Sequence, residues 1–384
     1  MGERDLLMIP GPTNVDPMVL RSMARPTISH TSTTFASVFK ETVTDLGRIF
    51  KTKGIVLPLA GTGTLGAEVA LSNIIEPGDK VLSISGGYFG DRLAEIAGNL
   101  GANMDKVDVP WGSAARIENI ERKLSETAYK AMLVVHVDTS TGVANPMKEL
   151  GSLARAKGVL FVVDSVCSMG GMDVQVDDWG INVCFTGSQK ALAAPPGIAV
   201  ISFDSKALEV REKRRTSPSS YYGDIKRWLP ILQEPTKYFA TPAVNMFYAL
   251  RESCKMILSE GLEERFKRHA KLASAFRAGL KGMGLQLLCE DAVASNTLTV
   301  AFHPKGVSDA EFRKSMAEDY GVVIAGGLGP LKDKAFRVGH MGNVNRSDIL
   351  ATLSAIEGSL GKQAYQFQPG SGVSTANRSL TATV

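Results

Sequence analysis

The stretch VLFVVDS, residues 159–165, is an unbroken apolar run that ends in an aspartate and a serine. A strand that is apolar at every position must be covered on both faces, which is typical of parallel sheets between helices. Similar runs are GIVLPLA (54–60), KVLSIS (80–85), AMLVVHVD (131–138), NVCFTGS (182–188) and GIAVISF (197–203). Helical patterns follow several of them. The alternation predicts an α/β large domain with a mainly parallel, mixed sheet covered by helices.

Polar residues follow or end these runs: Thr62, Asp138, Thr139, Asp164, Ser188 and Lys190. Ligands of open α/β sheets bind at the carboxyl ends of the strands. We therefore expect these residues to gather along one edge of the sheet, where chemistry would take place.

The last third of the chain has a different pattern. A long helical stretch covers 244–284, and a strand–helix–strand–strand–helix series follows it, which predicts a small α+β domain. We divide the chain into an extended N-terminal segment near the active site (1–20), a large domain (21–260) and a small domain (261–384). The tail after 362 is mostly polar, and we expect it to pack loosely.

Composition narrows the functional classes. Hydrophobic residues make up 44% of the 384 positions and charged residues 21%, as in soluble globular proteins. The net charge of +4 is small and dispersed, which argues against nucleic-acid or membrane partners. The four cysteines lack metal or disulfide spacing, and no leader or transmembrane run is visible. These features predict a cytoplasmic protein with reduced thiols and no metal.

The segment GTGTLG, residues 61–66, matches the dinucleotide fingerprint GxGxxG. A nicotinamide site would need an acidic residue at the end of the next strand, but KVLSIS ends in serine. Two readings remain open: a plain glycine-rich turn, or a loop whose N–H groups and helix N-terminus hold a phosphate.

The segment FTGSQKALAAPPG, residues 185–197, contains Lys190, the only formal charge between Asp178 and Asp204. A free lysine, with a pKa of about 10.4, is protonated and no nucleophile, but a Schiff base with a carbonyl cofactor removes that obstacle. Asp164 at a buried strand end needs a cationic partner, unless it only caps a turn. A phosphate, a ring nitrogen and an aldehyde together describe pyridoxal 5′-phosphate.

Eight ordered pieces carry a family resemblance: PGPTNV (10–15), GTGT (61–64), GGYFGDR (86–92), TSTG (139–142), DSVCS (164–168), GSQKAL with PPG (187–197), YFATPAVNMFYAL (238–250) and FRVGHMG (336–342). In these pieces the chain resembles the class V aminotransferases of pyridoxal-phosphate fold type I. Within that family it is most similar to the alanine–glyoxylate, serine–glyoxylate and serine–pyruvate enzymes.

The resemblance implies roles around the cofactor ring. Lys190 would form the Schiff base and carry the proton between the substrate and the cofactor, while Asp164 would pair with the ring nitrogen. Phe89 would stack on the ring, although many relatives have tryptophan there. Thr139 would contact the hydroxyl side of the ring, and Val166 would pack on its other face.

The resemblance also implies how phosphate and substrate are held. The phosphate would be bound by Thr62, Gly63, Thr64 and Gln189, with histidine common in relatives at the position of Thr64. Tyr238 and Thr241 would reach the phosphate in the neighbouring subunit of a homodimer. Arg337 would bind the substrate α-carboxylate, with the backbone near Gly11 closing the pocket.

Three functions stay open at this stage. The first is ping-pong transamination from serine or alanine to pyruvate or glyoxylate, because one arginine clamp suits a single carboxylate. The second is another class V enzyme such as a cysteine desulfurase, although the loop 323–333 contains no cysteine nucleophile. The third is a non-catalytic binding protein, against which the intact Lys190, Asp164 and Arg337 argue.

Overall fold

The run VLFVVDS forms the central strand β8 (Leu160–Asp164) of a seven-stranded sheet in the computed structural model, which describes residues 5–382. The strand order is β2-β10-β9-β8-β5-β3-β4. The other strands are β2 (Ile55–Gly61), β3 (Lys80–Ser85), β4 (Asn103–Asp108), β5 (Ala131–Val135), β9 (Val183–Gly187) and β10 (Gly197–Phe203). Only β10 runs antiparallel to its neighbours, so the predicted mainly parallel, mixed sheet is confirmed.

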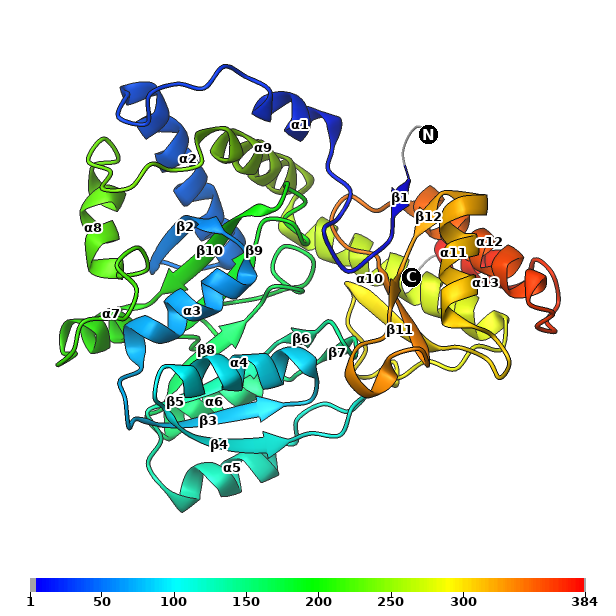
Figure 1. Ribbon diagram of the computed structural model, residues 1–384, viewed down its shortest axis with the longest axis horizontal. Coiled ribbons are helices and arrows are strands. Elements are labelled where there is room, and N and C mark those ends of the chain that lie inside the picture. The colour runs from blue at the N-terminus through cyan, green and yellow to red at the C-terminus, as the bar shows by residue number, and fades with distance from the viewer. Residues whose placement is uncertain (1–4, 383–384) are drawn as a thin grey trace.

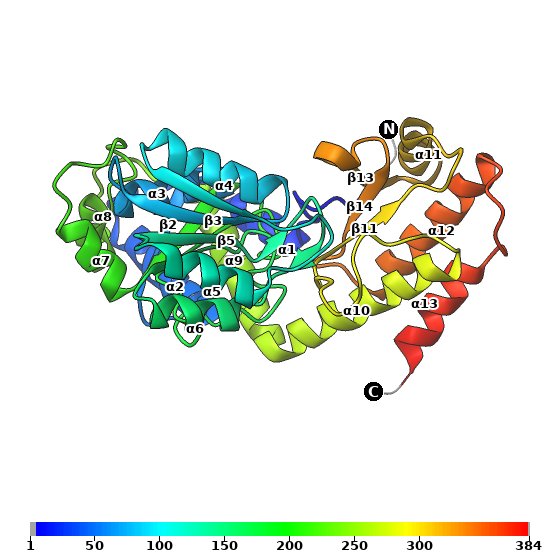
Figure 2. The ribbon, with the colours of Figure 1, turned by 90° about the horizontal axis from the view of Figure 1, so that it is seen from below.

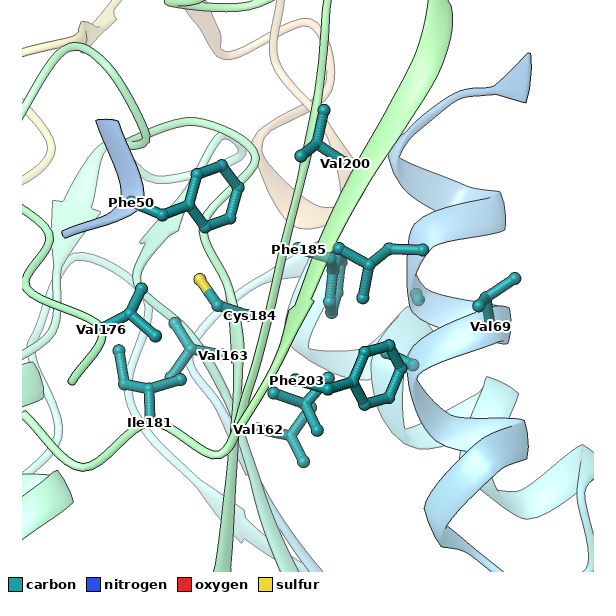
Figure 3. Close-up of a cluster of buried hydrophobic side chains, with 14 of the residues drawn as sticks. Phe50, Val69, Val162, Val163, Val176, Ile181, Cys184, Phe185, Val200 and Phe203 are labelled. Carbon is teal, nitrogen blue, oxygen red and sulfur yellow. The ribbon is translucent and has the colours of Figure 1, made fainter. Parts of the chain in front are cut away.

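Helices cover both faces of this sheet (Figure 1). They are α1 (Pro17–Met23), α2 (Thr33–Phe50), α3 (Gly63–Ile74), α4 (Tyr88–Asn99), α5 (Ile117–Glu126), α6 (Met147–Ala156), α7 (Ser205–Glu212), α8 (Ile225–Gln233) and α9 (Val244–Glu260). Figure 3 shows why the strands are continuously apolar: Val163 and Cys184 point towards Phe50, while Phe185 points to the opposite face, towards Val69 of α3.

A second body lies beside the sheet (Figures 1 and 2). Its antiparallel sheet has the order β11-β14-β13, and two short strand pairs, β1 with β12 and β6 with β7, lie outside both larger sheets. The elements of the second body are β11 (Leu298–Phe302), α11 (Asp309–Tyr320), β12 (Val322–Val323), β13 (Ala325–Gly326), the 3₁₀ helix η1 (Gly329–Leu331), β14 (Ala335–Gly339), α12 (Arg346–Lys362) and α13 (Ser371–Thr381). The remaining short strands are β1 (Leu6–Leu7), β6 (Val137–Asp138) and β7 (Val143–Ala144).

The long predicted helical stretch is two helices. Gly261, with φ +83°, ends α9, and α10 (Leu262–Gly282) then runs into the second body. This break lies beside the proposed boundary between 21–260 and 261–384, and the division itself stays a prediction. In the proposed first segment, 1–20, residues 17–20 already belong to α1, and residues 1–4 lie outside the described part.

The expectation of a loosely packed tail is wrong. Residues 371–381 form α13, which buries Ala376 and Leu380 against α10 and α12. The helices approach closely because small residues face each other: a Cβ on Gly279 would lie 3.0 Å from the carbonyl oxygen of Gly372. The polar composition of this segment suggested loose packing, but glycine, serine and threonine can also line a close contact between helices.

Two further findings bear on the composition argument. Within residues 5–382 no helix has the length and apolar character needed to cross a membrane. The four cysteines are unpaired; three are buried and Cys289 is half-buried.

Candidate active site

A cavity of about 150 Å³ lies at the carboxyl ends of β5 and β8, beside the first turns of α3 and α4. Predicted site residues that line it are Thr62, Gly63, Thr64, Phe89, Thr139, Asp164, Val166, Gln189 and Lys190. The structure therefore brings together residues from five separate parts of the sequence. Of the other predicted polar edge residues, Asp138 and Ser188 are buried behind the cavity rather than lining it.

Asp164 ends β8 and is 9% exposed. Its Oδ1 accepts a hydrogen bond from the backbone N–H of Val166 at 2.8 Å. Burial raises the pKa of this carboxyl to about 7, and the nearby carboxylate of Asp138 adds to the effect. A neighbouring cation strongly stabilises a buried carboxylate, so the position suits a protonated ring nitrogen.

Lys190 lies in the turn that follows β9, and its Nζ donates a hydrogen bond to the carbonyl oxygen of Pro10. Thr13 binds the same turn, because its hydroxyl donates to the carbonyl of Lys190 at 3.0 Å. Gly11 has φ +109°, and a Cβ there would lie 2.5 Å from Cδ of Lys190. Only glycine leaves room for the lysine, so the N-terminal segment closes this side of the site.

The loop at the start of α3 has open hydrogen-bonding capacity. Thr62 is the N-cap, and its side chain makes no capping hydrogen bond within the described chain. A Cβ on Gly63 would lie 2.7 Å from Cγ2 of Val166, so the loop passes close to the residue expected on one face of the ring. The free N–H groups of the first turn suit a phosphate.

Two buried polar atoms at the cavity have no hydrogen-bond partner in residues 5–382: Oγ1 of Thr139 and Oε1 of Gln189. Buried polar atoms are normally satisfied, so both call for a ligand. The hydroxyl of Thr139 can donate to a ring oxygen, and the amide of Gln189 can present its N–H₂ donors to a phosphate by a flip. Together with Asp164 and Lys190, these residues fit pyridoxal 5′-phosphate.

Asp138 fixes the helix that carries Phe89. Its Oδ2 accepts from the backbone N–H groups of Phe89 at 2.9 Å and Gly90 at 3.1 Å, which caps α4. Its Oδ1 accepts from the N–H and hydroxyl of Ser140. The carboxylate thus satisfies the helix N-terminus and holds Phe89 at the cavity.

Arg92 is a cavity residue that the sequence reasoning missed, although it ends the quoted piece GGYFGDR. Its guanidinium carbon lies 4.6 Å from the ring centroid of Phe89 and 5.2 Å from that of Tyr88. The spacing of three residues after Phe89 on a helix was the available signal. Cys167 also lines the cavity, and burial raises the pKa of its thiol.

Arg337 lies on β14 and is held by backbone carbonyls. Its Nε donates to Gly326 at 2.7 Å, and its Nη1 donates to Thr139 at 3.2 Å. Burial lowers the pKa of the guanidinium, which remains a cation. Arg337 does not line the cavity itself, but its contact with Thr139 places it at the cavity's edge.

Tyr238 and Thr241 lie apart from the cavity of their own chain. The ring of Tyr238 packs against Phe35, Phe39 and Trp228, and its hydroxyl is buried without a partner in the described residues. Thr241 is exposed. Their predicted contact with a neighbouring subunit stays a prediction.

Among residues 5–382 no group of three or more His, Cys, Asp and Glu side chains is arranged to hold a metal ion.

Comparison with known proteins agrees with this site. The family model described as aminotransferase class-V matches residues 18–332. An uncharacterized aminotransferase of Methanocaldococcus jannaschii is 40% identical, with 98% of each chain covered. The serine–glyoxylate aminotransferase of Arabidopsis thaliana is 33% identical, over 97% of this chain and 94% of the relative. The crystal structure of the ureidoglycine–glyoxylate aminotransferase from Bacillus subtilis matches with a TM-score of 0.96 at 34% identity, covering 100% of this chain and 99% of that one. The chain therefore belongs to the class V aminotransferases, pyridoxal 5′-phosphate enzymes of fold type I that act on amino acids and 2-oxo acids.

Proposed function

We propose that this enzyme transfers the amino group of serine or alanine to glyoxylate or pyruvate in a ping-pong reaction. The observation that carries the proposal is the placement of Lys190, Asp164 and Thr139 in one cavity, with Arg337 bonded to the backbone of Thr139. The names of the Arabidopsis and Bacillus relatives, which combine different amino donors with glyoxylate, support glyoxylate as acceptor.

Each residue has a defined task in this proposal. When bound, the cofactor supplies an electron-withdrawing ring. Asp164 keeps the ring nitrogen protonated, and Arg337 holds the substrate α-carboxylate with two parallel N–H donors. Lys190 Nζ would take the proton from the substrate Cα and pass it to C4′ of the cofactor, and the second half-reaction would need the same transfer in reverse.

The preference for a short donor rests on charge and space. Arg337 suits a single carboxylate, and Gly11 with the AGG segment at 325–327 leaves little side-chain bulk near it. Arg92 is the competing feature, because it places a second guanidinium at the cavity. A dicarboxylic donor such as aspartate would be favoured if Arg92 reached its distal carboxylate.

We further propose a homodimer with shared active sites. Neither Tyr238 nor Thr241 lines its own chain's cavity, and the exposed Thr241 supports a role for this segment at the phosphate of a second copy. One helix N-terminus stabilises an anion by only about 0.3–1 kcal/mol, so a doubly charged phosphate needs further donors. The partner subunit would supply them.

The test is a half-reaction screen. Purified holoenzyme is mixed with single amino acids, and the change of cofactor absorbance is followed; kcat/KM for serine, alanine, aspartate and glutamate is then measured with glyoxylate and with pyruvate. We expect serine to be the best donor. A preference of about tenfold or more for aspartate or glutamate, lost in Arg92→Gln, would replace the single-carboxylate proposal with a dicarboxylate one.

A further inference from the structure

The turn that carries Lys190, residues 188–194, contains no helix and no strand. Backbone groups in such a turn need donors from elsewhere in the chain. The hydroxyl of Ser253 on α9 donates to the carbonyl of Leu192, and Nη2 of Arg265 on α10 donates to the carbonyl of Ala191 at 2.8 Å. The position of the lysine therefore depends on side chains more than sixty residues away.

Arg265 joins the segments that follow both predicted cofactor residues. It is 2% exposed, and besides Ala191 it donates through Nε to the carbonyl of Gly170 at 2.8 Å. Gly170 lies in the turn after Asp164, and a Cβ on Gly170 would lie 3.2 Å from Cδ2 of Leu192. The two turns pack directly on each other, and one planar guanidinium bridges them.

Arg268 likewise donates hydrogen bonds to backbone carbonyls, in this case near the strand of Arg337, the proposed binding residue for the substrate carboxylate. Its Nη1 donates to the carbonyl of Val344 at 2.7 Å and its Nη2 to that of Gly342 at 3.1 Å. These carbonyls lie in the loop that leaves β14, the strand of Arg337. Arg268 is thus bonded to the loop only five residues beyond the proposed carboxylate clamp.

Glu260 connects the two arginines. Its carboxylate accepts from Nη1 of Arg265 at 2.7 Å and from Nε of Arg268 at 2.6 Å. His269 completes the cluster, because its Nε2 accepts from the N–H of Gly342 at 3.0 Å while Nδ1 faces the carbonyl of Arg265 at 2.7 Å. Burial lowers the pKa of His269, so the ring is neutral and can accept at Nε2.

We propose that Arg265 and Arg268, joined by Glu260, are positioning residues that fix the Lys190 turn relative to the strand of Arg337. Arg265 is buried and Arg268 and Glu260 are half-buried, and ion pairs in such positions often add little net stability, so stability alone does not account for them. What they add is a set of directional donors for carbonyls on both sides of the site. The inference rests on the proposed roles of Lys190 and Arg337.

Charge-conserving variants test it in the holoenzyme. Arg265→Lys keeps the charge but loses the fork, and we expect the Kd for pyridoxal 5′-phosphate to rise about tenfold and kcat to fall about tenfold, with the donor KM nearly unchanged. Arg268→Lys should instead raise the donor KM about fivefold with the cofactor Kd nearly unchanged. A change in cofactor Kd and kcat in one variant, and in donor KM in the other, is what we expect if Arg265 positions the Lys190 turn and Arg268 positions the strand of Arg337.

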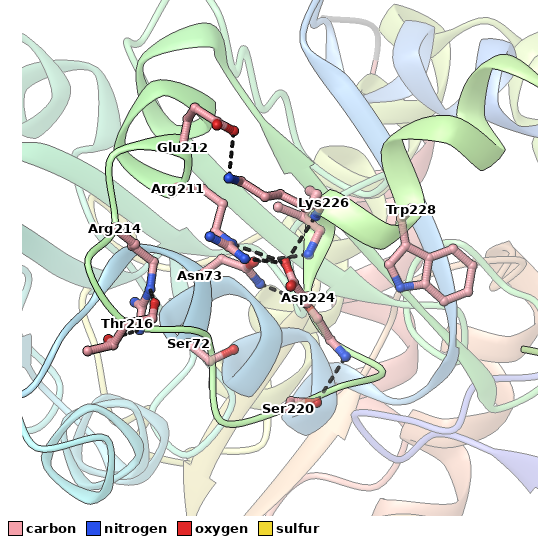
Figure 4. Close-up of polar contacts among 12 residues, drawn as sticks. Ser72, Asn73, Arg211, Glu212, Arg214, Thr216, Ser220, Asp224, Lys226 and Trp228 are labelled. Atoms are coloured by element: carbon pink, nitrogen blue, oxygen red, sulfur yellow. Dashed lines mark hydrogen bonds and ion pairs between the residues drawn. The ribbon is translucent and has the colours of Figure 1, made fainter. Parts of the chain in front are cut away.

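Arg211→Lys is the matched control. Arg211 is also a buried arginine, and it forms hydrogen bonds of 3.0 and 2.7 Å with Asp224 beside α3 (Figure 4). Its variant should lower the melting temperature but leave the cofactor Kd and the donor KM unchanged. Glu260→Gln, which preserves side-chain shape, should weaken both sides of the cluster more mildly and replaces any arginine variant that fails to fold.

The outcomes separate this inference from the proposed function. Borohydride reduction and peptide mapping of Arg265→Lys should place the pyridoxyl label on Lys190. A label on Lys190 with unchanged Kd, kcat and KM in Arg265→Lys, Arg268→Lys and Glu260→Gln overturns the positioning roles alone. A label on another lysine overturns both the positioning roles and the proposed role of Lys190.

Discussion

Asp164 and Lys190 have different local environments, and each environment calls for a different part of the same ligand. Asp164 is a carboxyl whose pKa is raised to about 7 by burial. Lys190 donates to the carbonyl of Pro10, in a turn that otherwise has no formal charge nearby in sequence. Pyridoxal 5′-phosphate would suit both residues, since its ring nitrogen would pair with Asp164 and its aldehyde would react with Lys190.

Lys190→Ala should abolish turnover and the visible absorption of the lysine-bound cofactor while the fold persists, because the turn is held by its backbone contacts with Thr13 and Arg265. Circular dichroism checks the fold, and borohydride reduction of the wild type followed by peptide mapping identifies the attachment site. A pyridoxyl label on a different lysine would reject the assignment.

Asp164 predicts a pH effect on stability without cofactor. Its folded pKa of about 7 lies above the ordinary 3.8, so the folded state binds the proton more tightly. The contribution to unfolding free energy is complete at low pH and is lost as the pH rises from about 4 to 7, by about 4 kcal/mol in total. Asp164→Asn lacks this dependence.

Urea unfolding of the cofactor-free wild type and of Asp164→Asn at several pH values between 4 and 8 measures the difference. Adding cofactor should reduce the wild-type dependence, because a ring cation stabilises the carboxylate. In the transamination reaction, Asp164→Asn should lose about 3–5 kcal/mol of transition-state stabilisation, by analogy with a broken buried pair. Parallel pH profiles or wild-type rates would contradict the pairing.

The polar ends of the apolar runs were sufficient to predict that Thr62, Thr139, Asp164 and Lys190 meet at the cavity, and the family resemblance added residues such as Phe89 and Gln189. They were insufficient for residues that act across the fold. Asp138 was recognised as a polar strand end, but the N–H groups it caps lie 48 and 49 positions earlier. Arg265 and Arg268 were recognised only as part of a helical stretch, because the backbone carbonyls that they bind lie in irregular turns, which have no recognisable sequence pattern.

At the scale of elements, α4 shows how one cap determines a site. Asp138→Ala removes the acceptor for two helix N–H groups and should lower the unfolding free energy by about 1–2 kcal/mol. Because Phe89 lies in this first turn, the affinity for pyridoxal 5′-phosphate should fall as well. Unfolding and cofactor titration of the same protein measure the two effects.

Asp204→Ala is the control for this variant. Asp204 caps α7 through the N–H of Ala207 at 2.7 Å and does not line the cavity. It should cost similar stability with no change in cofactor affinity. Equal cofactor affinity in wild type and Asp138→Ala would show that the cap has no bearing on the site.

Elements with a strong apolar period were predictable, and elements with a weak one were not. The runs at 80–85 and 197–203 form strands with those bounds. The edge strand β4, NMDKVD, was not recognised because it is polar and largely unburied. Helix α13 was missed because its contact with α10 depends on small residues, which give no hydrophobic pattern.

For the whole molecule, a homodimer with shared sites predicts complementation. Co-expression of Lys190→Ala chains with Tyr238→Ala/Thr241→Ala chains should restore about a quarter of wild-type activity, because half of the random dimers contain one intact site of two. Each variant alone should be nearly inactive. Full activity of a monomer at nanomolar concentration, or no recovery in verified hybrid dimers, would contradict shared sites.

The parallel pairing of β1 with β12 joins Leu6 to Val322, two residues that are far apart in the sequence. Synthesis at 5–20 residues per second separates the two strands by roughly 15–60 seconds on the ribosome. During that time the first strand has no partner, and the segment of Gly11 and Thr13 is held beside the lysine only by its bonds to the Lys190 turn, among them those of Thr13. The large sheet can form earlier, but the lysine's surroundings are completed only when nearly the whole polypeptide has emerged. Stable capture of the vitamin-derived coenzyme is therefore expected to follow translation rather than accompany it.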